Sequence, residues 1–263
     1  MATPDIPISG LFFAFLLLAI PVLIMHKTRL PMMRETVWSF LRMSVQLGLA
    51  GIFLTVLFDY NNPLLNVLWL CVMITVAAYE SVRKQELNIK KLYLPTVAAF
   101  VITTVLSLVY FEILIIQDGG IAEARFLIPI GGMLLGNSLG GTIIAVSLFY
   151  SDLRRNENRY ISGLSFGAQR TEALLPYFRT ALKSALKPSL GNVAVMGIVF
   201  LPGLMTGQLI AGLSPMTAIT YQIALMLTIY TATTVCVTIA IILTSYISFD
   251  EFGMLKKDIF LRK

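Results

Sequence analysis

Apolar residues fall into long runs along this chain, with short polar segments between them. Seven runs are long enough to cross about 30 Å of hydrocarbon as helices. They are Ile8–His26, Thr36–Phe58, Leu64–Glu80, Tyr93–Ile116, Phe126–Tyr150, Ser189–Ala211 and Met216–Ile247. The pattern predicts an all-α, polytopic protein with about seven transmembrane helices, which form a single membrane domain over residues 1–263.

The composition agrees with this pattern. Hydrophobic residues make up 57% of the chain and charged residues 13%, whereas soluble domains carry about 25% charged residues. Both cysteines, Cys71 and Cys236, lie inside apolar runs, so neither a disulfide framework nor a metal-binding cluster is indicated. Residues 1–7 contain no Lys or Arg, so we interpret the first run as a retained span and not as a cleaved signal peptide.

Basic residues predict the orientation. Of the 20 Lys and Arg residues, only Arg125 lies in a segment that seven alternating spans would place outside. Because basic loops stay on the cytoplasmic side during insertion, we expect an outside N-terminus and a cytoplasmic C-terminus in a multi-pass protein of the inner (plasma) membrane. Topology and contact with the lipid bilayer then explain the net charge of +6, and no nucleic-acid partner is indicated.

Few polar side chains interrupt the spans. Arg42 and Gln46 share one helical face of the second run, and we expect a buried polar contact between them. Glu80 ends the third run, and Glu112 lies near the end of the fourth. Our first interpretation is that both side chains lie at the membrane interface, with their carboxylates extended toward water.

Small residues form stripes in the fifth and sixth runs, at positions four residues apart: Gly132, Gly136 and Gly140, then Gly203, Gly207 and Ala211. Such stripes mark close helix packing in lipid. Both runs also contain a proline and an amide, Pro129 with Asn137 and Pro202 with Gln208, and Gln222 follows in the seventh run. Pro202–Gly203 should kink or break its helix. Close helix packing would by itself explain each stripe of small residues. The amides that accompany the stripes favour a gated pathway.

Catalytic and metal-binding motifs are absent from the sequence. His26 is the sole histidine, and no phosphate-binding loop of the form GxxxxGK[ST] occurs. We therefore predict that the chain is not an enzyme and binds no metal or cofactor itself. With so few acidic residues in the spans, a tight site for a bare divalent cation is also hard to build.

The longest cytoplasmic segment is Ser151–Pro188, which the sequence predicts as two helices broken near Gly167. From Thr171 onward, Arg179, Lys183 and Lys187 form a basic stripe opposite an apolar face. An amphipathic helix on anionic lipid would explain the stripe, but it would not explain the exposed apolar Phe166 in the turn before it. A helix–turn–helix knob of this kind suits a cytoplasmic partner.

Four stretches resemble the Fet-type iron-export permease family of ABC transporters, which includes plant aluminium-tolerance permeases. They are "HKTRL…ETVWSFLRMSVQLGLAG" (His26–Gly51), "LIPIGGMLLGNSL" (Leu127–Leu139), "LSFGAQRTEA" (Leu164–Ala173) and "GIVFLPGLMTGQLIAGLSPMTAITYQI" (Gly197–Ile223). The resemblance implies a homodimeric permease whose partner, a separate cytoplasmic ABC ATPase, binds ATP and Mg²⁺. It also implies hallmark positions at Arg42, Gln46, Asn137, Pro202, Gly203, Thr206, Gly207, Pro215, Tyr221 and Gln222.

The resemblance further implies that Leu164–Ala173 couples the permease to the ATPase, through Leu164, Ser165, Phe166, Gly167, Ala168, Glu172 and Ala173. We include Arg42, Gln46, Asn137, Thr206, Gln208, Tyr221 and Gln222 as candidates for the translocation pathway, and Gly132, Gly136, Gly140, Pro202, Gly203 and Gly207 as packing or gating positions.

The chain departs from the family pattern at two places. Gly191 and Ala194 stand where members usually carry Asp and Lys. If that pair contributes to substrate handling or to a cytoplasmic gate, this protein handles a different substrate. Gln169 and Arg170 replace a usual capping residue and proline, so we expect a helix start that is weaker by roughly 1 kcal/mol.

The hypothesis is a permease subunit that exports iron, another metal or a small solute. One alternative is an ATPase-independent channel or secondary transporter that uses Arg42, Glu80 and Glu112 as relay groups. Another is a membrane scaffold or assembly protein whose knob binds a protein other than an ATPase.

Overall fold

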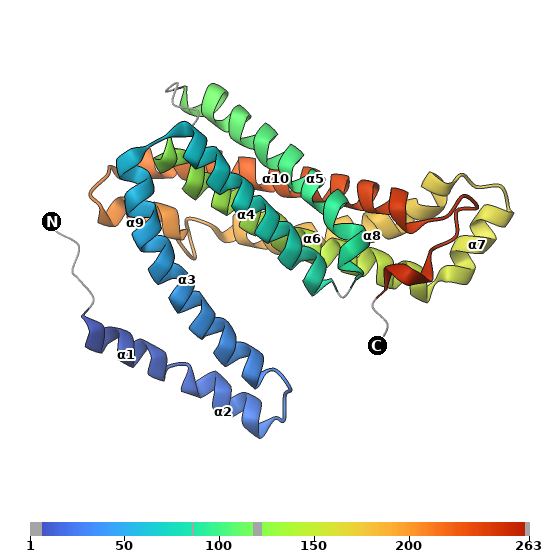
Figure 1. Ribbon diagram of the computed structural model, residues 1–263, viewed down its shortest axis with the longest axis horizontal. Coiled ribbons are helices and arrows are strands. Elements are labelled where there is room, and N and C mark those ends of the chain that lie inside the picture. The colour runs from blue at the N-terminus through green and yellow to red at the C-terminus, as the bar shows by residue number, and fades with distance from the viewer. Residues whose placement is uncertain (1–6, 86, 118–122, 261–263) are drawn as a thin grey trace.

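The computed structural model describes residues 7–85, 87–117 and 123–260. These residues fold almost entirely into helices (Figure 1), which confirms the all-α prediction. The elements are α1 (Ile8–Leu16), α2 (Ala19–Lys27), α3 (Met33–Tyr60), α4 (Pro63–Lys84), α5 (Ile89–Tyr110), the π-helix η1 (Phe111–Ile116), α6 (Ala124–Arg155), α7 (Glu157–Ser165), α8 (Arg170–Val195), α9 (Gly203–Ile210), α10 (Pro215–Ser248) and the 3₁₀ helix η2 (Lys257–Ile259).

Within the described residues, six helical segments are long and apolar enough to cross a membrane: α1 with α2, α3, α4, α5 with η1, α6 and α10. Each matches a predicted span to within a few residues. The expected seventh, Ser189–Ala211, is not a single helix. Helix α8 ends at Val195, Gly197 has a left-handed φ of 83°, and α9 begins only after Pro202 with eight residues. This confirms the predicted break near Pro202–Gly203, but the break begins earlier, at Met196.

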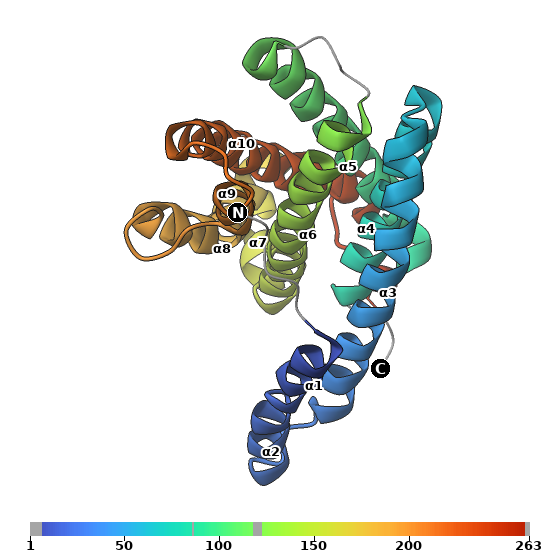
Figure 2. The ribbon, with the colours of Figure 1, turned by 90° about the vertical axis from the view of Figure 1, so that its left-hand side faces the viewer.

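Helices α4, α5, α6, α8 and α10 form the packed body, with α6 in contact with α4, α8 and α10. The pair α1–α2 and most of α3 lie away from this body (Figure 2). Their apolar side chains are exposed: the α1–α2 span is 0% buried and the α3 span is 6% buried. A lipid bilayer or a second chain can cover such surfaces without the cost that water would impose.

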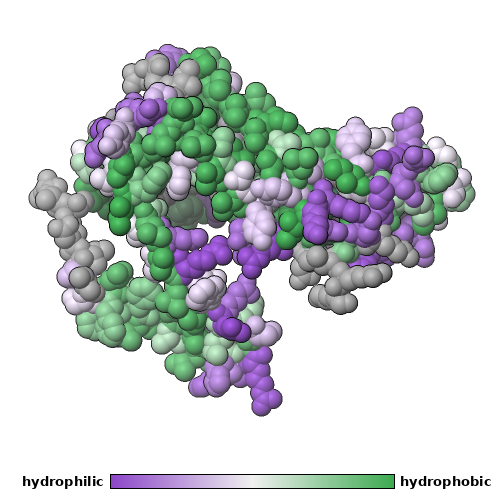
Figure 3. Space-filling view, in the orientation of Figure 1, coloured by the Kyte–Doolittle hydropathy of each residue, from purple (hydrophilic) through white to green (hydrophobic). Residues whose placement is uncertain are grey.

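Hydrophilic residues gather at one end of the molecule, and smaller hydrophilic groups lie in the centre of this face and at the bottom of the view (Figure 3). The polar end carries α7, the start of α8 and the segment that follows α10. The orientation predicted from the basic residues would place this end in the cytoplasm.

Helix α8 belongs to the packed body and does not lie apart as a surface helix. Ala181 and Ala185 are buried, and Leu174, Phe178 and Leu182 pack against the same core. The basic residues Arg179, Lys183 and Lys187 point outward and are exposed. The apolar face predicted from the sequence is therefore buried by α6 and α10, which explains it without a lipid surface.

Two glycines allow the closest helix contacts. A Cβ added at Gly141 of α6 would lie 2.7 Å from Cγ2 of Thr233 in α10, and one at Gly131 would lie 2.9 Å from Cδ1 of Leu70 in α4. Helices α6 and α10 run in the same direction, since Gly141 meets Thr233 while Tyr150 bonds Ser248 further along both helices.

We predict that Gly141→Ala lowers stability while its neighbour Gly140→Ala does not. Nothing lies within 4 Å of a Cβ at Gly140, and both changes gain the same helix propensity. Thr233 is β-branched and stiff in a helix, so the crowded variant should be less stable by about 1–3 kcal/mol. Thermal unfolding of both variants in detergent measures the difference, and equal midpoints would contradict this packing.

Candidate functional site

The predicted coupling segment forms a tight turn between α7 and α8. The amide of Gly167 donates to the carbonyl oxygen of Leu164 at 3.0 Å, and the amide of Ala168 donates to that of Gly163 at 3.1 Å. Gly167 has a φ of 90° with nothing within 4 Å of an added Cβ. The glycine therefore ends α7 through its left-handed conformation, as the sequence predicts.

The turn has an outer and an inner side. Phe166 is 92% exposed at its tip, and the neighbouring Ser165 is exposed. Leu164 and Ala173 instead pack against the core cluster that includes Tyr160 and Phe249, and Ala168 is half-buried. A large aromatic ring is thus presented outward on a turn whose base is fixed in the protein.

Helix α8 begins with a capping box. The Oε2 atom of Glu172 accepts a hydrogen bond from the backbone amide of Gln169 at 3.0 Å, as part of a capping box. In the same capping box the Gln169 side chain accepts from the backbone amide of Glu172, the role that serine or threonine has in the family pattern. That glutamine caps this helix more weakly than serine or threonine stays a prediction.

Arg170 ties the start of α8 to the end of α10. Its Nη2 atom donates to the carbonyl oxygen of Ser245 at 2.7 Å, and its guanidinium lies 4.3 Å from the ring centre of Phe249. These contacts connect the base of the turn to the end of α10.

The predicted contact between Arg42 and Gln46 is replaced by an ion pair. Nη2 of Arg42 lies 3.2 Å from Oε1 of Glu80 on α4, and Nη1 of Arg83 lies 3.4 Å from the same oxygen. Gln46 is exposed on α3. The interpretation was wrong because the nearest carboxylate lies on the next helix, at a distance that helical spacing does not reveal.

The predicted glycine stripes lie mainly on open faces. Gly132 approaches Cε of Met73, but Gly136, Gly140, Gly203 and Gly207 have nothing within 4 Å of an added Cβ. Close packing within the chain uses Gly131 and Gly141 instead, each one position away from the α6 stripe.

The candidate pathway residues do not meet in one cavity of the single chain. Asn137 is exposed and bonds its own helix at Met133. Thr206 and Gln208 lie on α9, and Tyr221 and Gln222 lie on α10, which contacts α9. Figure 2 shows α3, with Arg42 and Gln46, on the opposite side of α6 from α9 and α10.

Two of the candidate pathway amides carry unused hydrogen-bonding capacity. The Oε1 atoms of Gln208 and Gln222 are buried without a hydrogen-bond partner in the protein, and Gln222 is only 5% exposed. A buried carbonyl oxygen without a partner is costly, so these atoms are suited to bind a polar group or a water molecule.

Glu112 is buried, contrary to the snorkelling interpretation. It is 5% exposed, and neither carboxylate oxygen has a hydrogen-bond partner. It lies in the π-helix η1, a local distortion that is frequent at functional sites. Its position near the end of the apolar run Tyr93–Ile116 does not predict this burial. Among the described residues, no three His, Cys, Asp or Glu side chains are grouped as a metal site would require.

Comparison with known proteins identifies the family. A model of the uncharacterised family UPF0014 matches residues 8–249. The chain belongs to the UPF0014 family. No solved structure matches it significantly.

Three relatives illustrate the range of the family. A UPF0014 membrane protein of Synechocystis sp. is 32% identical over 81% of this chain and 82% of its own length. "Probable iron export permease protein FetB" of Escherichia coli is 29% identical over 96% of this chain and 94% of its own. "Protein ALUMINUM SENSITIVE 3" of Arabidopsis thaliana is 29% identical over 81% of this chain and 77% of its own. The UPF0014 chain is therefore a multi-pass membrane protein of the family that the sequence motifs indicate.

We predict that Arg170→Lys loosens the coupling turn. Lysine keeps the charge but loses the planar group that stacks on Phe249 while bonding Ser245. Stability should fall by about 1–2 kcal/mol, and amide hydrogen exchange around Gly167 should accelerate. Arg179→Lys, on the exposed stripe of the same helix, is the matched control. Equal exchange in the two variants would show that Arg170 does not anchor the turn.

Proposed function

We propose that this UPF0014 protein is the membrane-spanning permease subunit of an ABC transporter, driven by a separate ATPase. The observation that carries the proposal is the knob formed by α7, the turn and α8, with Phe166 92% exposed at its tip. An aromatic side chain on a fixed turn is the kind of anchor that protein interfaces use.

The knob is connected to the spanning helices in a way that suits mechanical coupling. Helix α7 follows α6 after a single residue, Asn156. On the other side of the turn, Arg170 bonds the end of α10. A force on Phe166 would therefore act on both α6 and α10, the closely packed pair at the centre of the protein. ATP and Mg²⁺ would bind the partner subunit, so hydrolysis is assigned there.

A homodimer is part of the proposal. Among the described residues, no neighbour covers the open glycine face of α6 or the exposed face of α3. A second copy would cover these faces and could bring the polar positions of α3 and α9 to one pathway. ABC permeases require two membrane halves for two ATPase subunits, which agrees with this arrangement.

The proposed substrate is iron, another metal or a small solute, exported from the cell. The name of the relative from Escherichia coli supports iron. The free oxygens of Gln208 and Gln222 favour a chelated metal or a polar organic solute over a bare divalent cation, which prefers carboxylate or imidazole ligands.

We predict that Gly167→Pro and Glu172→Arg uncouple the ATPase from transport. Proline cannot adopt the φ of 90° at position 167, and arginine replaces the capping carboxylate with a cation at a helix N-terminus. Membrane insertion should be unchanged, while permease-stimulated ATP hydrolysis should fall about tenfold, equivalent to about 1.4 kcal/mol of coupling free energy.

The assay uses the complex purified from its native host and reconstituted into vesicles. Gly163→Ala is the control, because an added Cβ meets only Ala173 at an ordinary 3.9 Å. Normal stimulation in both test variants would remove the coupling assignment from this turn.

A second candidate function is a proton-coupled secondary transporter, which the buried Glu112 favours. Intramembrane carboxylates without a partner are typical of proton relays. In that case Glu112→Gln would abolish proton-driven solute flux in vesicles without ATP, whereas Glu80→Gln, which removes the ion pairs with Arg42 and Arg83, would reduce it less. Flux that needs ATP and survives Glu112→Gln would exclude this candidate.

A further inference from the structure

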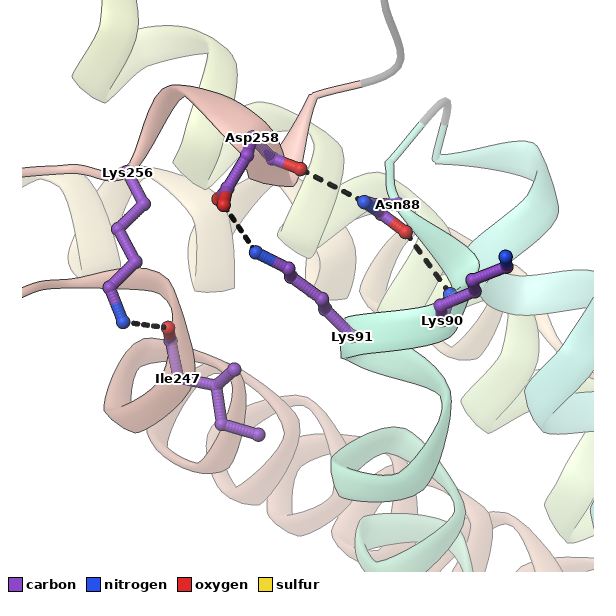
Figure 4. Close-up of polar contacts among 6 residues, drawn as sticks. All are labelled: Asn88, Lys90, Lys91, Ile247, Lys256 and Asp258. Atoms are coloured by element: carbon purple, nitrogen blue, oxygen red, sulfur yellow. Dashed lines mark hydrogen bonds and ion pairs between the residues drawn. The ribbon is translucent and has the colours of Figure 1, made fainter.

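A C-terminal strap, residues 249–260, folds back across the polar end of the helical body after α10. Figure 4 shows its attachment to the start of α5. The amide of Asn88 donates to the carbonyl oxygen of Ile259 at 2.8 Å, and its Nδ2 donates to that of Asp258 at 3.0 Å. The ammonium group of Lys91 pairs with the Asp258 carboxylate. The strap is thus held at its far end by three contacts.

The strap is also part of the core. Phe249, Leu255 and Ile259 are buried in the same cluster as Tyr160 of α7. The hydrogen bond from Lys91 holds the pKa of Asp258 below its ordinary value. The strap therefore behaves as a fixed element.

Near its beginning, the strap makes a tight turn that presents an aromatic ring. The Oδ1 atom of Asp250 accepts hydrogen bonds from the amides of Phe252 at 3.0 Å and Met254 at 2.7 Å. Gly253 adopts a φ of 76°. Phe252, which stands between these fixed residues, is 85% exposed.

This second turn contacts the coupling segment directly. The Tyr160 hydroxyl donates to the carbonyl oxygen of Gly253 at 2.8 Å. A Cβ added at Gly253 would lie 3.6 Å from Cδ1 of Leu164. Burial raises the pKa of Tyr160, which keeps the hydroxyl protonated as a donor. The turn that carries Phe252 is therefore braced against the turn that carries Phe166.

We propose that the partner ATPase docks on a composite surface made of both turns, with Phe166 and Phe252 as its two aromatic anchors. This inference rests on the proposed function and extends it, because the strap becomes a second contact between the permease and the ATPase. Two aromatic anchors on braced turns match the pattern of interface hot spots, in which a few buried rings supply most of the binding free energy.

The surroundings favour a protein over a lipid surface as the occupant. The exposed basic residues Arg154, Arg155 and Arg159 lie between the apolar part of α6 and the end of α7. Hydrophilic residues gather at this end of the molecule (Figure 3). An exposed aromatic ring with polar neighbours is typical of a protein interface, and continuity with the coupling turn identifies the ATPase as the partner.

The test is a co-purification of tagged permease variants from the native host, with the captured chain identified by mass spectrometry as a subunit with a phosphate-binding loop. Phe252→Ala should reduce recovery of that subunit about tenfold, and Phe166→Ala should do the same. Phe12→Ala is the matched control, since Phe12 is 63% exposed at the opposite end of the chain. Unchanged melting temperatures in detergent would show that the variants are folded.

A cross-linking experiment gives an independent measure. Phe252→Cys, in a chain whose exposed Cys71 is replaced by serine, is labelled with a maleimide photo-cross-linker in native membranes. The expected product joins the permease to the ATPase subunit. A lipid adduct, or full ATPase recovery with Phe252→Ala while Phe166→Ala loses it, would overturn the composite surface and leave the coupling turn intact. Recovery of no ATPase with the unaltered chain would overturn the proposed function itself.

Discussion

The approach of α6 to α10 at Gly141 determines how the rest of the structure packs. The absence of a side chain at this position lets Thr233 lie where a Cβ would otherwise collide. Lipid supplies no hydrophobic force between helices, so close packing and interhelical hydrogen bonds must hold the pair together. The bond between Tyr150 and Ser248, at 2.9 Å, adds such a contact further along. Helices α4 and α8 then pack on α6, and α5 packs on α10.

The sequence predicts the spanning helices well because their signal is local. Six runs of apolar residues appear as helices with ends within a few residues of the predicted ones. The run Ser189–Ala211 is predicted as one span because apolar residues predominate along it. In the structure, one helix ends before Gly197 and another begins after Pro202. The turn at Gly167 could be predicted for the same local reason. These are properties of single residues and their immediate neighbours.

Contacts between distant segments could not be predicted in this way. The ion pair of Arg42 joins residues 38 positions apart, and the Asn88 contact with the strap spans 170 positions. Helical spacing shows which residues share a face, but it does not show which helix that face meets. For the same reason, helical spacing predicts a packing stripe that includes Gly136 and Gly140, whereas the glycines that pack most closely within the chain are Gly131 and Gly141.

The broken segment between α8 and α9 limits how the protein can sit in its membrane. Helix α9 has eight residues and is therefore about 12 Å long. The broken segment lies at its N-terminal end, and the turn that leads into α10 lies at its C-terminal end. Ile198 and Val199 are 91% and 72% exposed there, on backbone that is not helical. Irregular backbone at membrane depth is stable only against protein or in contact with water. At membrane depth, this side of the molecule would therefore face a second chain or water, and the annulus of lipid around the protein would be interrupted at that point.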